Sequence, residues 1–174
     1  MVSSNSLFDG SLLGAAAQLS MPANHVIRPL EVTDFRKSYV ECLANLTVVG
    51  DITEQMFAES FEDMQRAGCY FVIVIEDLDS AKIVASGTLV VEQKFIRMCG
   101  RVGHIEDIVV AKGQQGKRFG FAIIKQLMEL ATATGCYKSI LDCSLDNVPF
   151  YEKCGLENKG IQMAAYVPGT AHKL

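Results

Sequence analysis

The stretch of residues 103–120 reads GHIEDIVVAKGQQGKRFG, and it decides the fold. It begins with an apolar pattern typical of a strand, which the acidic pair Glu106 and Asp107 interrupts. A loop rich in glycine and basic residues follows, and an amphipathic helix begins after it. Because a helix N-terminus presents unpaired N–H groups, this order of elements predicts a site for a phosphorylated ligand beside carboxylates.

The helix is predicted over residues 118–134, where apolar residues recur at three- and four-residue steps, with Gly135 as its C-terminal stop. Lys112, Lys117 and Arg118 in the preceding loop bring positive charge to outlying phosphates. A plain turn is the alternative for such a loop taken alone. A P-loop is excluded because no Gly-Lys-Ser/Thr occurs, and no spaced triple glycine indicates a dinucleotide-binding fold.

The strand before the loop cannot keep a strict alternation of apolar and polar residues. Over residues 105–110, alternation would bury a carboxylate whichever face packs on the core. One extra residue near Asp107 would resolve part of this conflict, so a β-bulge and a slot beside the strand are predicted there. The alternative is an edge strand whose two carboxylates face water.

Further strands are predicted over residues 25–29, 69–76, 83–94, 139–143 and 160–167. Two helices are predicted to follow the N-caps Thr33 and Thr53, and a short helix over residues 147–153 ends at Gly155. This order predicts an α/β fold with a central mixed sheet and helices on both faces. A ligand slot would form where the bulged strand separates from the strand at 139–143.

Composition favours one domain over residues 25–174, since the chain has 174 residues, 49% of them hydrophobic, and no low-complexity linker. Residues 1–24 contain no Lys or Arg and so lack the charge of a signal or transit peptide. They are interpreted as a mobile N-terminal arm, with docking of the apolar piece at residues 6–13 onto a partner as the alternative.

The net charge and the cysteine content limit which partners and which cell compartment are expected. A net charge of −4 argues against general nucleic-acid binding. Six cysteines without a CxxC pair suggest free thiols in a reducing, cytoplasmic setting, and three scattered histidines give no metal-ligand spacing. No metal is therefore expected. The apolar runs are too short to span a membrane.

The loop contains the pattern Q/R-x-x-x-x-G as QGKRFG at residues 115–120, and with its flanking strand and helix it resembles the acetyl-CoA-binding core of the GNAT superfamily of N-acyltransferases. More narrowly, GHIEDI at 103–108, GCYK at 135–138 and DCSLDNVPFYEKCG at 142–155 resemble the eukaryotic glucosamine-6-phosphate N-acetyltransferase subfamily. LTVVG at 46–50 and KFI at 94–96 add shorter matches. The resemblance extends over about residues 27–163.

The resemblance implies the GNAT acyltransferase fold, with a splayed, bulged strand, and direct acetyl transfer from acetyl-CoA to the amine of glucosamine 6-phosphate without a covalent acyl-enzyme. The product would enter UDP-N-acetylglucosamine biosynthesis. Tyr151 is implied to donate a proton to the departing thiolate, with a core aromatic pair beside Phe150 as the alternative. The residues implied to bind acetyl-CoA are Ile108, Val109, Val110, Gln115, Gly116, Lys117, Arg118, Phe119, Gly120, Asn147, Tyr151 and Lys153.

Carboxylates beside the slot are implied to orient the amine, and Glu106 and Asp142 are the catalytic candidates among them. Which of them removes a proton stays open, and water is the other acceptor. Lys94, Arg97 and Thr47 are implied to hold the sugar phosphate. The residues implied to bind the sugar are Thr47, Lys94, Phe95, Ile96, Arg97, Glu106, Asp107, Ile108 and Asp142.

One departure concerns the sugar phosphate. The subfamily carries an arginine three positions after the methionine that corresponds to Met163, and here that position is Tyr166. This change leaves room for an acetyltransferase that acts on another amine. A non-catalytic acyl-CoA-binding partner subunit is a separate alternative function. The resemblance further implies a homodimer in which the C-terminal strand crosses to the partner.

Overall fold

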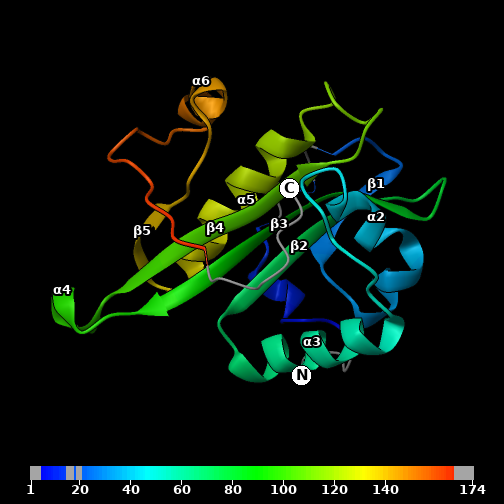
Figure 1. Cartoon of the computed structure of the whole chain (residues 1–174), viewed down its shortest axis with the longest axis horizontal. Helices are drawn as coiled ribbons and strands as arrows, with labels where there is room; N and C mark the ends of the chain where they lie inside the picture. Colours follow the sequence, from blue (N-terminus) through cyan, green and yellow to red (C-terminus); the bar gives the residue numbers. More distant parts are fainter. Residues whose placement is uncertain (1–4, 15–17, 19–20, 167–174) are drawn as a thin grey trace. The chain divides into compact units, whose positions relative to one another are not determined.

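The computed structural model describes residues 5–14, 18 and 21–166. The chain divides into two compact units, Met1–Leu141 and Asp142–Leu174. The first unit contains a five-stranded sheet in the order β1-β2-β3-β4-β5, with only β4 and β5 parallel (Figure 1). The strands are β1 (His25–Pro29), β2 (Tyr70–Asp77), β3 (Lys82–Gln93), β4 (Arg101–Val110) and β5 (Cys136–Ile140).

The predicted mixed sheet is confirmed, although β5 begins three residues earlier than predicted and ends at Ile140. Its early start follows from Gly135, whose φ of 78° ends the preceding helix sharply and leaves no room for a longer loop. The other helical elements are η1 (Gly10–Leu12), η2 (Val32–Lys37), α2 (Tyr39–Leu43), α3 (Glu54–Ala67), α4 (Ile96–Cys99) and α5 (Phe119–Ala133), and in the second unit η3 (Leu145–Asn147) and α6 (Val148–Lys153).

Helices cover both faces of the sheet, as predicted. A Cβ added to Gly87 of β3 would lie 2.5 Å from the Cγ2 atom of Ile123, so this residue faces α5. Its neighbour Ser86 points to the opposite face, where α2 packs on β3. The core therefore lies on both sides of β3, and α5 lies along one face (Figure 1).

The helix expected after Thr33 is broken in two. Ser38 adopts a left-handed conformation with φ 61° between the 3-10 helix η2 and α2. By contrast, α3 follows its prediction: the Thr53 hydroxyl accepts a hydrogen bond from the Met56 N–H at 3.2 Å, and Gly68 ends the helix with φ 66°.

A bulge lies in β4 where it was predicted. Ser86 pairs with Val109 and Thr88 pairs with Glu106, so two steps on β3 stand opposite three on β4. Asp107 takes the extra position with φ 53°, a left-handed conformation that is uncommon for residues other than glycine.

Residues 5–14 differ from the predicted mobile arm, because they are packed on other residues of the first unit. The Leu7 N–H donates to the Leu30 carbonyl at 2.9 Å, and the Phe8 ring lies 5.2 Å from that of Phe71. Both apolar side chains are buried, and their burial holds the segment in place. Within the rest of the predicted arm, the Gln18 side chain donates to the His25 carbonyl at 3.2 Å. Residues 1–4, 15–17 and 19–20 fall outside the described residues.

The strand expected at residues 160–167 is absent from residues 160–166, and position 167 lies outside the described part of the chain. Ile161 and Met163 are 94% and 93% exposed. A strand requires a neighbouring strand for its backbone hydrogen bonds, and no described strand pairs with this segment.

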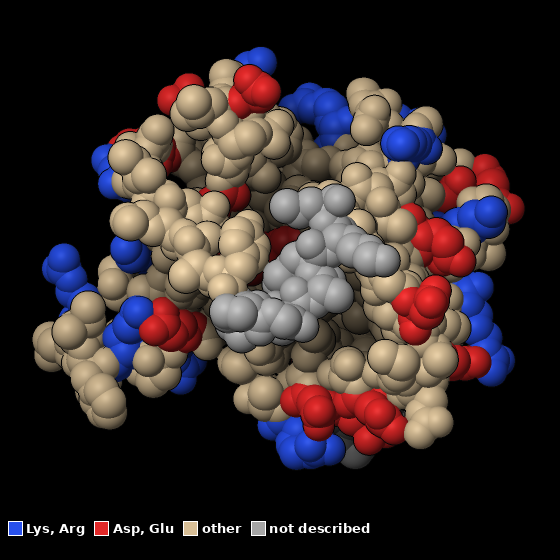
Figure 2. All heavy atoms as spheres, viewed as in Figure 1, with Lys and Arg blue, Asp and Glu red and all other residues tan. Residues whose placement is uncertain are grey.

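All six cysteines are free thiols. In the described part of the chain, no helix combines the length and apolarity that crossing a bilayer requires. Nor do the His, Cys, Asp and Glu residues described there form a group able to hold a metal ion. Lys and Arg side chains stand among Asp and Glu on the visible face rather than forming one basic field (Figure 2).

Candidate active site

The bulged strand β4 has an open side next to β5. The two strands pair only from Arg101 to His104, where β5 ends at Ile140, so residues 105–110 extend beyond it. The Ala111 N–H donates to the Val84 carbonyl on β3 at 2.9 Å. Because N–H groups alternate in direction along a strand, the Val110 N–H points to the open side. The splayed strand therefore offers the kind of backbone donor predicted for an extended ligand.

The acidic pair lies at this bulge with both carboxylates exposed, whereas Ile105 and Val109 are buried. The bulge resolves the burial conflict by turning Ile108 toward α5, where its Cδ1 atom would lie 2.6 Å from a Cβ on Gly87. Both predictions for this strand therefore hold in part, since the bulge is present and the carboxylates also face water.

The anion loop, residues 112–118, joins β4 to α5. Gly113 and Gly116 have φ of 83° and 84°, and Arg118 at the N-cap of α5 has φ 63°. These left-handed residues turn the chain sharply, and the first-turn N–H groups of α5 have no acceptor within the helix. Backbone N–H groups in such turns form anion-binding concavities, so the loop can receive a diphosphate.

Basic side chains surround the anion loop. Lys112, Lys117 and Arg118 are exposed. The Lys117 Nζ donates to the Gln114 Oε1 at 2.6 Å, and the Arg118 guanidinium lies 5.0 Å from the centre of the Phe121 ring. Phe119 is different, because its side chain is buried against His25 with the ring centres 4.8 Å apart. Of the predicted loop residues, Phe119 therefore has only its backbone available to a ligand.

The predicted sugar-binding residues of the first unit fall in two further places. Thr47 is exposed just after α2, and its N–H reaches the Leu43 carbonyl at 3.4 Å. Lys94 lies at the far end of the β3–β4 ribbon, where its N–H closes the hairpin onto the Gly100 carbonyl at 2.9 Å (Figure 1). Phe95, Ile96 and Arg97 form the exposed tip of this ribbon.

The second unit contains the other predicted site residues, Asp142, Asn147, Tyr151 and Lys153. Asp142, Asn147 and Lys153 are exposed, and Asn147 precedes α6. Tyr151 is half-buried, with its ring 5.0 Å from that of Phe150 in an edge-to-face arrangement. The aromatic pair with Phe150, which is the alternative role for Tyr151, is therefore present.

The phenol of Tyr151 is held in its protonated form. Burial raises its pKa above 10.0, and the nearby Cys143 and Cys154 thiols act in the same direction. A neutral phenol is a hydrogen-bond donor at physiological pH, so Tyr151 can donate to a thiolate.

Asn45 and Glu92, both outside the predicted set, contact residues assigned to a ligand. Asn45 accepts a hydrogen bond from the Lys112 N–H at 3.3 Å. Glu92 contacts Lys94 through one carboxylate oxygen and His104 through the other. Glu92 stands two positions before Lys94, which could have indicated a same-face pair, whereas nothing in the sequence links Asn45 to residue 112.

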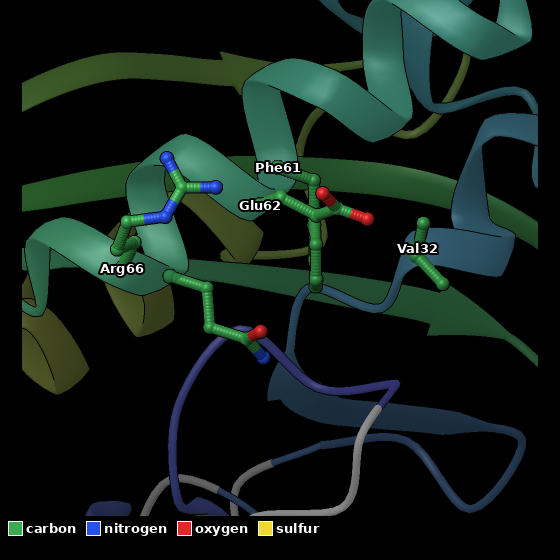
Figure 3. Close-up of a pocket in the computed structure, with 5 residues that line it drawn as sticks. Val32, Phe61, Glu62 and Arg66 are labelled. Atoms are coloured by element: carbon green, nitrogen blue, oxygen red, sulfur yellow. The ribbon is translucent and has the colours of Figure 1, made fainter.

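A separate hollow of about 460 Å³ lies between η2 and α3 (Figure 3). None of the predicted site residues lines it, and Gln65 at its edge donates to the Ser6 carbonyl at 2.8 Å. Its lining residues are Val32, Phe61, Glu62, Gln65 and Arg66.

The chain resembles known proteins over most of its length. Residues 32–156 match the model of the acetyltransferase (GNAT) family. Glucosamine 6-phosphate N-acetyltransferase of Arabidopsis thaliana is 48% identical over 80% of this chain and 95% of its own. Glucosamine 6-phosphate N-acetyltransferase 1 of Dictyostelium discoideum is 51% identical over 81% and 90%. The crystal structure of the Arabidopsis thaliana enzyme superposes with a TM-score of 0.80 at 46% identity, over 82% of this chain and 97% of that one.

Proposed function

Because the chain belongs to the acetyltransferase (GNAT) family, we propose that it transfers the acetyl group of acetyl-CoA to the amine of glucosamine 6-phosphate. One observation carries the proposal: the open side of the bulged strand β4 leads directly into the anion loop and the N-terminus of α5. A thioester with a long arm and a diphosphate needs an extended row of backbone donors followed by an anion site, and this continuous segment offers both.

The anion loop would hold the diphosphate through its backbone N–H groups, assisted by the exposed Lys112, Lys117 and Arg118. The Val110 N–H, and that of Ile108 near the bulge, would bind the pantetheine and the thioester carbonyl. Asn147 and Lys153 are assigned to the same ligand by resemblance.

Tyr151 is proposed as the general acid that gives its proton to the departing thiolate. Its raised pKa supports this role, because the phenol carries a proton to donate at neutral pH. The transfer is direct: the amine attacks the thioester, the carbon–sulfur bond breaks, and no side chain becomes acylated. Glu106 and Asp142 are the carboxylates assigned to the ammonium, with water as the alternative acceptor of its proton.

Lys94, Arg97 and Thr47 are assigned to the phosphate of the sugar. Lys94 and Arg97 supply charge at the ribbon end, and Phe95 and Ile96 form the surface between them. Tyr166 stands where the resemblance implies an arginine, so these two cations would bear most of the phosphate binding.

A homodimer with C-terminal strand exchange is part of this proposal. Exposed apolar side chains in both units support it, because a partner would remove them from water. In the first unit these are Phe95, Ile96 and Met98, which are 96%, 65% and 99% exposed; in the second, Ile161, Met163 and Tyr166 are 94%, 93% and 71% exposed.

A cytoplasmic setting, with the product passing to UDP-N-acetylglucosamine synthesis, completes the proposal. The six free cysteines favour a reducing compartment. A fluorescent fusion of the full chain tests the location, and loss of UDP-N-acetylglucosamine on gene disruption tests the pathway.

The activity is tested with purified protein, acetyl-CoA and glucosamine 6-phosphate. Loss of the thioester's ultraviolet absorbance is the suitable signal, because the six free cysteines would react with a thiol reagent. Turnover with the sugar phosphate is expected. Normal acetyl-CoA binding without turnover of glucosamine 6-phosphate would contradict the proposal. Turnover of other amines in a parallel panel would favour a different acceptor, the second candidate that Tyr166 supports.

A further inference from the structure

The β3–β4 ribbon carries a row of polar side chains on one face. Val90 pairs with His104, and Thr88 pairs with Glu106, so His104 and Glu106 share a face with the even-numbered residues of β3. Glu92 and Lys94 continue this row toward the ribbon end. The opposite face packs on α5, since a Cβ on Gly103 would lie 3.2 Å from the Ala131 Cβ. The row therefore lies on the face away from α5.

Glu92 is the central member of this row. Its Oε2 atom lies 2.8 Å from His104 Nε2 on the neighbouring strand, and its Oε1 atom lies 2.5 Å from Lys94 Nζ. Each carboxylate oxygen thus has its own partner. The side chains of Lys94, Glu92 and His104 are 30%, 42% and 32% exposed, so a ligand can reach all three.

Two opposite effects of Glu92 on a bound phosphate are conceivable. Its negative charge repels an anion near Lys94, and removing it would then strengthen phosphate binding. Alternatively, it fixes an ammonium that would otherwise move over many rotamers, and removing it would weaken binding. The second effect should prevail, because His104 holds the far oxygen and Lys94 keeps two further N–H donors for a ligand.

We propose that Glu92, held in place by His104, is a positioning residue that fixes the Lys94 ammonium for the phosphate of the sugar substrate. This inference rests on the proposed function. Hydrogen bonds from Lys94 and then His104 hold the pKa of the Glu92 carboxyl below its usual range, so the carboxylate is ionised at neutral pH. Glu92 touches no reacting atom, and its effect passes through Lys94.

The test compares two substrates in the wild type and in Glu92→Ala. With glucosamine 6-phosphate, KM is expected to rise about fivefold, the scale of one partly exposed ion pair, while kcat and the KM for acetyl-CoA change little. With glucosamine, which lacks the phosphate, kcat/KM is expected to stay unchanged. Inorganic phosphate gives a second reading, because its inhibition constant should rise by the same factor.

Two further variants sharpen the result. Glu92→Gln retains an oxygen acceptor for Lys94 and should restore part of the affinity, and His104→Ala should raise the same KM by a smaller factor. In the double variant of Glu92 and His104, the loss of binding free energy for the sugar phosphate should be smaller than the sum of the losses in the two single variants. The reason is that both residues act through one contact. Asp63→Ala is the matched control, since it removes an exposed ion pair with Arg66 on α3.

An unchanged or lower KM for the sugar phosphate in Glu92→Ala would overturn the inference, because charge repulsion would then prevail. If kcat/KM fell equally with glucosamine and with glucosamine 6-phosphate, the inference would also be overturned, because Glu92 would then have a structural role. Inactivity of the wild type toward glucosamine 6-phosphate would overturn the proposed function itself, and the inference with it.

Discussion

Asn45 ties the end of α2 to the first residue of the anion loop. Its Oδ1 accepts a hydrogen bond from the Lys112 N–H at 3.3 Å, while its Nδ2 donates to the carbonyls of Glu41 at 2.9 Å and Cys42 at 3.0 Å. Helix α2 itself packs on the sheet, with Tyr39 and Cys42 buried. The position of the loop is therefore set by a side chain 67 residues earlier in the chain.

Asn45→Ala should weaken acetyl-CoA binding, because the loop loses the contact that fixes its start. The expected rise in the dissociation constant is about three- to fivefold, as for one hydrogen bond, with little change in the KM for the sugar. Titration calorimetry with acetyl-CoA measures it. Gln55→Ala is the control, since that amide bonds Glu59 on the exposed surface of α3. Equal affinities in the two variants would contradict the role of Asn45.

Tyr151→Phe should lower kcat by about 10²-fold or more, because the general acid is lost. Acetyl-CoA binding should remain close to that of the wild type, since the ring and its contact with Phe150 are kept. Tyr137→Phe, at a 45% exposed position, serves as the control. Steady-state kinetics and calorimetry together decide between two functions: a chain that only binds acyl-CoA would show no turnover in either variant or in the wild type.

The bulge in β4 could be predicted because the sequence contains its cause. The run from Ile105 to Val110 has apolar residues on both parities, and one extra residue near Asp107 lets both carboxylates face water while Ile105 and Val109 are buried. The break at Ser38 had no such signal, since serine rarely adopts a left-handed conformation. Asp34 in η2 is also held by two hydrogen bonds from Arg28 on β1, a tertiary contact that no local pattern specifies.

Those parts of the candidate site that are formed by neighbouring residues in the sequence could be predicted. The anion loop and the N-terminus of α5 are adjacent in sequence, so their pattern indicates them directly. The contacts of Asn45 with Lys112 and of Glu92 with His104 depend on helix placement and strand register, which no local pattern specifies.

Gly87→Ala should destabilise the first unit, because the new Cβ would meet the Ile123 Cγ2 at 2.5 Å and the Ile108 Cδ1 at 2.6 Å. The expected loss in unfolding free energy is about 1–3 kcal/mol, as for other overpacked cores. Urea denaturation measures it. In Gly160→Ala, by contrast, no atom of the described residues beyond its chain neighbours lies within 4 Å of the added Cβ, and stability should hardly change. Similar midpoints for both variants would disprove the close packing opposite the bulge.

Arg28→Ala should be strongly destabilising, because it leaves the fully buried Asp34 carboxylate without the guanidinium that pairs with it at 2.7 Å. Breaking a buried pair costs about 3–5 kcal/mol. Arg36→Ala breaks an ion pair with Glu54 whose side chains are 75% and 51% exposed, and should cost less than about 1 kcal/mol. Thermal unfolding of the two variants compares them directly, and losses of equal size would count against this ranking.

The same cluster predicts how stability depends on pH. Burial opposes ionisation of Glu76, yet hydrogen bonds from Lys37 and Arg28 prevail and lower its pKa from 4.5. A carboxyl with a lowered folded pKa contributes its full stability above its unfolded pKa, and that contribution is lost as pH falls through the folded value. The wild type should therefore lose stability below about pH 4.5, and Glu76→Gln should show a flatter acid limb in urea titrations.

Removal of the residues after Gly160 should yield a monomer. The exposed Ile161 and Met163 are then absent, and with them the segment proposed to cross to a partner. Light scattering coupled to size-exclusion chromatography measures the mass, and kinetics should show a raised KM for the sugar with acetyl-CoA binding retained. Phe95→Ser in the full chain distinguishes the contributions of the two exposed apolar regions to the dimer. It alters the ribbon tip and leaves the C-terminal segment intact. If the truncated chain stays dimeric while Phe95→Ser becomes monomeric, the dimer forms through the ribbon tip and strand exchange is wrong.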